Sequence, residues 1–418
     1  MSKTFKIFTL GCKVNQYESQ EIRERFIEAG FSESENSLAD IYVINTCTVT
    51  SRADSESLNL IRRADRENPK AKIIVTGCLA ELDRPKIKNT HRRAIIVKNK
   101  DKQAMLEFLN GKKISAKGIS YFKGHSRAFL KIQDGCDNFC SYCKVPLVRG
   151  GSSSRPAKDI IKDAKRLVEN GYKEIVLTGI CLGAFGKDLK PKTNLVDLID
   201  KLENIDGLLR LRLSSIEAAD ISDNLVRKLA RSKKLCSHLH IPIQSGDDEI
   251  LKKMRRKYCS KDYLELIKKL RRHIPEIAIT TDVLVGFPGE TEQNFSNTVD
   301  LVKKIGSLKV HIFPFSPRPG TVANELNGRI NPVIVRKRIL ALQKVANGCS
   351  KNFRKKFLGR TETVLIEGRS KENTGFWEGY AGTYIKVLVK SNKNLSNRLI
   401  SLKLNKIAKN HMIGKISL

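Results

Sequence analysis

Short apolar runs alternate with amphipathic stretches over the first hundred residues. The runs KIFTL, IYVIN and KIIVT are typical of buried strands, whereas QEIRERFIEAG and the segment from Leu58 to Arg66 have helical spacing. Strands that alternate with helices predict a parallel sheet with helical crossovers. A polar, glycine-flanked segment from Asn110 to Gly118 indicates a linker. We therefore expect a first α/β domain over residues 3–111.

The same alternation resumes over a second, longer region. Six apolar runs are separated by helical patterns, and they read AFLKI, EIVLTG, LRLRLSS, HLHIPI, AITTDVLVGF and KVHIFPF. Six such units favour a partial (β/α)6 barrel over a doubly wound sheet, although periodicity alone leaves both open. We expect this second domain over residues 122–352, with its chemistry at the ends of the strands.

The pattern changes after a basic helical stretch from Val333 to Phe357. The β-like runs TETVLIEG, TGFWEGYAGTYIKVLVK and NRLISLKLN follow one another without intervening helices. They predict a small C-terminal antiparallel β barrel over residues 355–418, of the kind that often binds oligonucleotides. The expected fold class is therefore α/β, with three domains.

Charge narrows the choice of partners. The 418 residues include 78 lysines and arginines against 44 acidic residues, a net charge of +34 that attracts polyanions such as nucleic acid. A lysine-rich solvated surface without any such partner is the alternative. No stretch approaches the roughly 20 apolar residues of a membrane helix, so we expect a cytoplasmic protein with no membrane partner. Ten cysteines in a reducing compartment favour metal binding or catalysis over disulfides.

Three cysteines lie close together in KIQDGCDNFCSYCKVPLVRGG. Cys136, Cys140 and Cys143 have C-x3-C-x2-C spacing directly after a predicted strand. Thiolates hold iron–sulfur clusters, and four-iron clusters usually take four ligands, so three thiolates would leave one iron open to another chelating group. A zinc knuckle or three buried cysteines are the alternatives, but no nearby residue completes a familiar zinc spacing.

A second group of cysteines is scattered in sequence. Cys12, Cys47 and Cys78 each follow an apolar run, in KIFTLGC, IYVINTC and KIIVTGC. Because the carboxyl ends of parallel strands share one edge of a sheet, we expect these thiols to converge. Independent burial of each cysteine is the alternative. The remaining four cysteines show no such pattern, and we interpret them as structural: Cys181, Cys236, Cys259 and Cys349. The role of Cys181 is left open.

These features together resemble the radical S-adenosylmethionine methylthiotransferases over nearly the whole chain. The strings GCKVNQYES and NTCTVTSRADSES are most similar to the branch that acts on N6-threonylcarbamoyladenosine next to the anticodon of transfer RNA. The resemblance implies two 4Fe-4S clusters, one on each cysteine group. It also implies S-adenosylmethionine as methyl donor and as the source of a 5′-deoxyadenosyl radical that removes hydrogen from C2 of the adenine. No acid–base residue is assigned.

The resemblance also implies cofactor-binding positions. Tyr142 occupies the aromatic position expected near the adenine of S-adenosylmethionine, and the other candidates end strands: Thr178, Gly179, Ser215, Gln244, Val285 and Gly286. Barrel packing would equally explain small residues at such places. One departure is Ser153, where relatives of this branch are expected to carry arginine.

The C-terminal region resembles the TRAM module, an RNA-binding β barrel. Trp377 and Tyr380 are candidates for base stacking, and Arg255 and Arg256 for phosphate contacts. Core packing is the alternative for Trp377, and a solvated face for the basic run. The implied partners are the anticodon loop of transfer RNA and an electron donor such as flavodoxin or ferredoxin, with no DNA expected.

Four rival functions stay open at this point. The same machinery could act on N6-isopentenyladenosine in transfer RNA or on a ribosomal protein. The chain could also be an RNA-binding redox sensor with structural clusters, or a zinc-dependent RNA-binding module.

Overall fold

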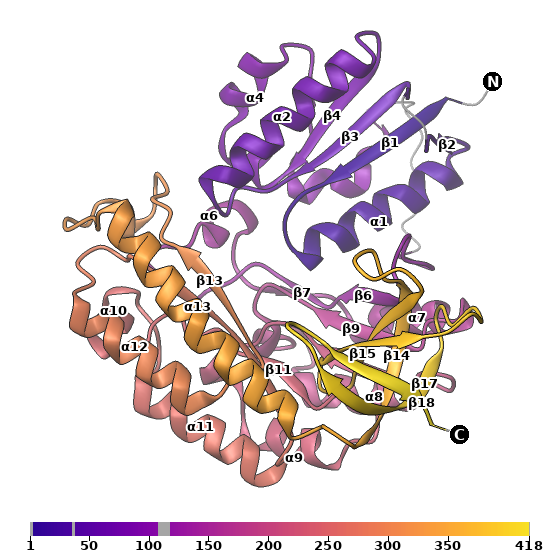
Figure 1. Cartoon of the computed structure of the whole chain (residues 1–418). Coiled ribbons are helices and arrows are strands. Elements are labelled where there is room, and N and C mark those ends of the chain that lie inside the picture. Colours follow the sequence, from indigo (N-terminus) through magenta and orange to yellow (C-terminus); the bar gives the residue numbers. More distant parts are fainter. Residues whose placement is uncertain (1–2, 36–37, 108–117, 418) are drawn as a thin grey trace.

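The computed structural model describes residues 3–35, 38–107 and 118–417, and Figure 1 shows how its parts are arranged. The amino-terminal α/β part lies at the top of that view, the central barrel below it, and the carboxyl-terminal barrel to the lower right. All but the last residue of the predicted linker falls outside the described residues.

The amino-terminal part is a parallel sheet in the strand order β2-β1-β3-β4-β5. Every residue of the central strand β3 is buried, which explains the apolar run with which it begins, because helices cover both faces of such sheets. The strands are β1 (Thr4–Thr9), β2 (Ser32–Glu33), β3 (Ile41–Thr46), β4 (Lys72–Gly77) and β5 (Ile95–Ile96). The helices are α1 (Lys13–Glu28), α2 (Ser51–Glu67), α3 (Cys78–Leu82), α4 (Arg84–Thr90) and the 3₁₀ turn η1 (Asn99–Ala104).

The central part contains the six parallel strands that the sequence predicts. They form the sheets β10-β9-β6 and β11-β12-β13, which are bridged where Leu211 pairs with Leu235 and Ser215 with His240. This is a partial barrel with β6 and β13 at its open edges. The strands are β6 (Arg127–Lys131), β9 (Glu174–Thr178), β10 (Arg210–Leu213), β11 (His238–His240), β12 (Ala278–Val285) and β13 (Lys309–Pro314).

Helices cover the outside of this partial barrel, and short elements shape its loops. The helices are α6 (Val145–Arg149), α7 (Ala157–Glu169), α8 (Leu195–Glu203), α9 (Asp223–Arg231), α10 (Asp248–Lys253), α11 (Ser260–His273) and α12 (Glu292–Ile305). The short elements are the hairpin β7 (Gln133–Asp134) with β8 (Ser153–Ser154), and the turns η2 (Leu182–Ala184), η3 (Ala218–Asp220) and η4 (Val322–Asn324).

The long helix α13 (Pro332–Lys355) leads into a closed five-stranded barrel, as predicted. Its strands are β14 (Thr361–Arg369), β15 (Phe376–Ala381), β16 (Lys386–Lys390), β17 (Leu399–Ile407) and β18 (Met412–Ile416). Four of its strand pairs are antiparallel, but β16 and β18 pair in parallel, so the barrel is not purely antiparallel.

The C-terminal barrel lies against the amino-terminal ends of the central strands. Arg210 at the start of β10 donates to the carbonyl of Tyr380 at 3.2 Å, and Arg212 donates to the carbonyl of Gly382 at 3.0 Å. The amino-terminal sheet lies at the opposite end of the central barrel, beyond α6 (Figure 1). The carboxyl ends of both sheets therefore point into one region. Among the described helices, none is both long and apolar enough to span a membrane.

Candidate active site

The loop that follows β6 brings the first cysteine group together. Cys136 donates its backbone N–H to Gly150 at 3.1 Å, and Cys143 donates to the carbonyl of Cys140 at 3.0 Å, which closes a tight turn. All three side chains are partly exposed, and the Cys143 thiol interacts electrostatically with those of Cys136 and Cys140. Three soft ligands on one short loop suit an iron–sulfur cluster with an open iron.

This loop has little room for variation. Gly135 has φ +67°, and a Cβ there would lie 1.9 Å from the carbonyl oxygen of Gly151, so only glycine fits. The Gln133 amide donates to the carbonyl of Gly135 at 2.8 Å and accepts from the backbone of Cys181 at 2.8 Å. Gln133 thus ties the cysteine loop to the end of β9.

A buried arginine lies against the same loop. Arg256 donates to the Cys140 sulfur at 3.3 Å and to the Tyr142 hydroxyl at 3.5 Å, and it pairs with Glu217. Only 3% of its side chain is exposed. Burial raises the pKa of Tyr142 well above its usual value, so the phenol stays protonated beside the cysteines.

Burial also governs the protonation of the thiols. It raises the pKa of Cys143 to about 12 and that of Cys47 to about 11, whereas a hydrogen bond with Cys181 lowers the pKa of Cys136 to about 7. Because metal ligation requires thiolates, binding of iron to Cys143 and Cys47 must release protons. Cys181, whose role the sequence left open, lies beside Cys136, and its thiol hydrogen-bonds the Asp220 carboxylate at 3.5 Å.

The second cysteine group converges at the carboxyl edge of the amino-terminal sheet. Thr9 pairs in register with Asn45, and Thr46 with Gly77, which places the ends of β1, β3 and β4 together. A Cβ on Gly11 would lie 3.0 Å from the Cys47 sulfur. The three thiols, those of Cys12, Cys47 and Cys78, interact electrostatically, as expected for one shared site.

A charged network joins the two cysteine groups. Arg149, on the helix after Cys143, donates to Glu18 of α1 at 2.9 Å and to Asp134 at 2.8 Å. Lys131 lies 3.2 Å from Glu18, and Lys102 also pairs with it. Only 5% of the Glu18 side chain and 2% of the Arg149 side chain are exposed. Such a buried network holds the amino-terminal sheet against the cysteine loop of the barrel.

A second contact fixes the other side of this junction. Arg318 donates to the Asp54 carboxylate at 2.6 Å and to the backbone carbonyl of Thr48 at 3.0 Å. Thr48 directly follows Cys47, so the central barrel helps to position the loop of that thiol.

The predicted cofactor-binding residues end strands around the barrel mouth. Thr178 and Gly179 close β9, and Gly179 lies against Gln133 of the cysteine loop. Ser215 bridges to β11, and Gln244 has φ +65° and pairs with β12. Val285 and Gly286, the last two candidates, lie at the end of β12. The structure therefore places all six predicted strand-end residues on the same side of the barrel as the first cysteine group.

The residues predicted to contact RNA are placed less favourably. Trp377 is 5% exposed, packs in the C-terminal barrel core, and has the Arg369 guanidinium 4.4 Å from its ring centre. Core packing accounts for it, because a buried ring offers no stacking face. Arg256 is buried at the cysteine loop, so it contacts no solvent-borne phosphate in this fold, whereas Arg255 is exposed. Tyr380 stacks on Tyr384 with ring centres 5.0 Å apart.

Sequence reasoning missed the residues that support the site: Gln133, Glu18, Arg149, Glu217 and Arg318. Their partners lie far away along the chain, 131 residues for the pair of Arg149 and Glu18, so one sequence gives no signal for them. Ser153 lies at an exposed position in β8, opposite Asp134 in the hairpin.

Known proteins resemble both parts of this arrangement. Residues 130–302 match the Radical SAM superfamily, and residues 4–98 match the uncharacterized protein family UPF0004. The chain is 38% identical to the threonylcarbamoyladenosine tRNA methylthiotransferase MtaB of Bacillus subtilis, across 96% of this chain and 94% of that protein. It is 34% identical to the tRNA-2-methylthio-N(6)-dimethylallyladenosine synthase of Carboxydothermus hydrogenoformans, across 99% of each.

A solved structure shares the fold. The radical S-adenosylmethionine methyltransferase TsrM from Kitasatospora setae superimposes with a TM-score of 0.56 over 78% of this chain and 77% of its own, at 14% identity. The likeness concerns the architecture alone.

Proposed function

Because this chain belongs to the family of radical S-adenosylmethionine tRNA methylthiotransferases, we propose that it transfers a methylthio group to C2 of N6-threonylcarbamoyladenosine in transfer RNA. The product is the 2-methylthio form of that nucleoside, next to the anticodon. The higher identity to the threonylcarbamoyladenosine enzymes, 38% against 34% for a dimethylallyladenosine enzyme, supports this choice of substrate.

The observation that carries the proposal is the pairing of two three-cysteine groups across one junction. Each group lies at the carboxyl ends of parallel strands, and the Glu18–Arg149 contact of 2.9 Å links the elements that carry them. In this proposal Cys136, Cys140 and Cys143 hold the first 4Fe-4S cluster. The second cluster is held by the other three: Cys12, Cys47 and Cys78. When bound, the clusters and S-adenosylmethionine supply the one-electron chemistry and the methyl group.

The chain's own residues bind, shield and orient. Tyr142 and Arg256 lie against the Cys140 side of the first site, where Arg256 donates to both the Cys140 sulfur and the Tyr142 hydroxyl. Gln133 fixes the loop against the end of β9, where Thr178 and Gly179 help to seat S-adenosylmethionine. No side chain acts as general base, because an aromatic C–H is too weakly acidic for an acid–base pair.

The proposal extends to partners. The net charge of +34 favours the anticodon arm of transfer RNA as the polyanion bound. Reduction of a cluster requires an external electron donor, for which flavodoxin or ferredoxin is suited. Both the substrate and such donors are cytoplasmic, and so is the proposed site of action.

Nucleoside mass spectrometry tests the substrate. We expect transfer RNA from cells that lack the gene to lose the methylthio form of threonylcarbamoyladenosine and to accumulate the unmodified nucleoside. Complementation with the wild-type chain restores the product, and complementation with Cys140→Ser does not. If the dimethylallyladenosine product disappears instead, the substrate assignment is overturned.

Metal analysis tests the two cluster sites separately. Anaerobically reconstituted protein is expected to carry about eight irons, and Cys47→Ser or Cys140→Ser about four each. The matched control is Cys349→Ser, because this cysteine lies on α13 away from both groups and should leave the iron content unchanged. A zinc content of one or more per chain, without iron, would contradict the proposal.

A further inference from the structure

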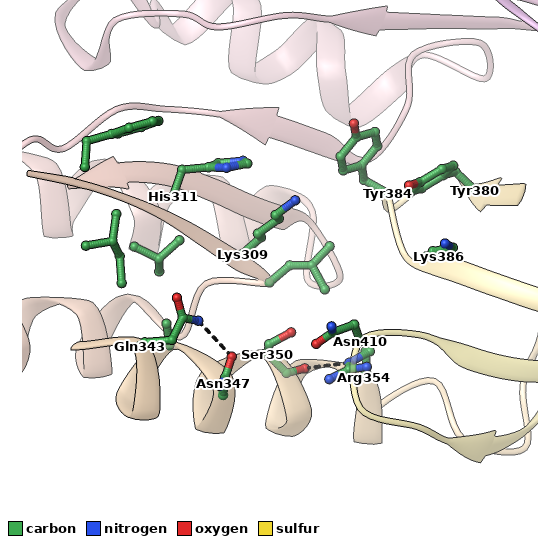
Figure 2. A pocket seen from close by; sticks show the side chains of 15 residues that line it. Lys309, His311, Gln343, Asn347, Ser350, Arg354, Tyr380, Tyr384, Lys386 and Asn410 are labelled. Atoms are coloured by element: carbon green, nitrogen blue, oxygen red, sulfur yellow. Dashed lines mark hydrogen bonds between the residues drawn. The ribbon is translucent and has the colours of Figure 1, made fainter. Parts of the chain in front are cut away.

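A cavity of about 500 Å³ lies between the open edge of the central barrel and the C-terminal barrel. Its walls are strand β13, helix α13 and the start of β16, and Figure 2 shows their side chains facing a common space. None of the residues that line it is acidic, whereas Lys309, Arg354 and Lys386 carry positive charge. The volume suits a small organic ligand or one nucleotide, and the charge selects an anion.

One wall of the cavity is an exposed aromatic ring. Phe313 is 45% exposed although it lies on a strand of the barrel. Its ring is stacked with that of His311, with the ring centres 6.5 Å apart and an interplanar angle of 15°. Aromatic faces left open beside positive charge are the common feature of sites for unpaired bases.

The three positively charged side chains differ in whether they already have a partner within the protein. Lys386 pairs with Glu378 at 2.9 Å, and Arg354 donates to the carbonyls of Ala408 and Lys409. Lys309 differs, because no carboxylate in the described ranges lies within ion-pair distance of its ammonium group. Figure 2 shows it directed into the cavity. Lys309 is therefore the cation available to a bound anion.

The same strand also offers backbone groups. β13 pairs only with β12 in its sheet, so one of its edges carries no sheet hydrogen bonds. Unpaired strand edges are ready donors and acceptors for an incoming chain. The cavity also borders the barrel interior, since His311 lies 5.7 Å from His240, ring centre to ring centre, across the inner face of the sheet.

We propose that this cavity, along the open edge of the central barrel, binds one unpaired nucleotide of the anticodon loop. The base stacks on the open face of Phe313, and its phosphate pairs with Lys309. This assignment rests on the proposed tRNA substrate, and it adds a subsite outside both cysteine groups. It explains why the C-terminal barrel is attached where it is: it closes the site from the side opposite β13.

Binding measurements test the subsite without requiring catalysis. The full chain is titrated into a fluorescent RNA hairpin that carries the anticodon loop, and in parallel into a blunt duplex with the same stem and no loop. We expect Phe313→Ala to weaken hairpin binding about 5-fold to 100-fold and to leave duplex binding unchanged. Phe313→Tyr, which keeps the ring, should bind the hairpin nearly as well as the wild type.

Lys309→Gln has a different expected signature. It should lower the slope of log K against log salt by about 0.7 for the hairpin, the contribution of one phosphate contact on a single strand. Lys303→Gln is the matched control, because Lys303 is exposed on α12 and already paired with Asp300 at 3.0 Å. Leu340→Ala, on the exposed side of α13, controls for the loss of apolar surface.

Two results of the binding measurements would contradict the proposed subsite. Equal weakening on hairpin and duplex by Phe313→Ala, or no change on the hairpin, overturns the subsite. Normal melting temperatures exclude misfolding as the cause of weak binding. If the variants behave as expected but the wild-type chain gives no methylthio product, the proposed reaction fails and the RNA subsite stands.

Discussion

Glu18 is the residue whose removal should most disturb the junction between the two cysteine groups. Its carboxylate is 5% exposed and faces three cations, those of Lys102, Lys131 and Arg149. Asp134 also pairs with Arg149, but among the described residues Lys102 has no other carboxylate partner. Glu18→Gln therefore leaves a buried ammonium without a counter-charge, a loss of about 3 to 5 kcal/mol in folding free energy.

Urea unfolding measures this loss. At a slope of about 2 kcal/mol per molar urea, the midpoint of the amino-terminal transition should fall by about 1.5 to 2.5 M. Glu56→Gln is the matched control, because Glu56 forms an exposed pair with Arg52, in which 88% of the arginine side chain is exposed. Such a surface pair contributes only about 0.5 kcal/mol to folding stability, so the urea midpoint of Glu56→Gln should hardly differ from that of the wild type.

The pH dependence gives a second measure of the same residue. Burial alone would raise the pKa of Glu18, but the three neighbouring cations hold it well below its usual value of 4.5. The stability that Glu18 provides is complete above pH 4.5 and is lost as the pH falls through the lower, folded-state pKa. Glu18→Gln should lack this part of the acid transition. A midpoint shift as small as that of Glu56→Gln would refute the reasoning.

Three further predictions concern other parts of the molecule. Trp377→Ala should cost about 3 to 5 kcal/mol and unfold the C-terminal barrel first, as followed by circular dichroism during heating, because the ring is 5% exposed in the barrel core. Burial and the nearby Lys309 charge lower the pKa of His311 to about 4, so stability should decline as the pH falls from 6.5 to 4, and His311→Asn should remove that decline in acid titrations. Gly135→Ala should reduce the iron content of the first site, because the added Cβ would collide with the backbone of Gly151. Gly348→Ala is the control, because a Cβ at that position meets no neighbouring atom within 4 Å.

The sequence predicted the fold because its signals are local. Each of the longer strands in the two parallel regions carries its own apolar run, and each cysteine of both groups directly follows or lies near such a run, whereas the two-residue strands β2 and β5 were not predicted. Parallel topology then brings Cys12, Cys47 and Cys78 to one edge, as the register of β1, β3 and β4 confirms. The parallel pairing of β16 with β18 was missed, since strand direction in a small barrel depends on the turns between strands and not on residue pattern.

Side chains with two plausible roles were harder to place. Arg256 lies in the basic run KKMRRK, which suggests a phosphate contact, yet its guanidinium turns inward because Glu217 and the Cys140 loop provide partners there. Trp377 has the aromatic ring expected of a residue that stacks on bases, but the barrel core needs a large apolar residue at that position. In contrast, Phe313 and Lys309 drew no attention in the sequence, because only the packing of α13 and the C-terminal barrel creates the cavity they face.

The most direct test of the central claim is product analysis with the purified chain. Anaerobically reconstituted protein is supplied with a reductant, S-adenosylmethionine, a sulfur source and transfer RNA that carries either threonylcarbamoyladenosine or isopentenyladenosine. The account predicts a 2-methylthio product from the first RNA that is absent with Cys47→Ser and Cys140→Ser. Methylthiolation of the second RNA alone, or cleavage of S-adenosylmethionine with no methylthio product on either RNA, would contradict it.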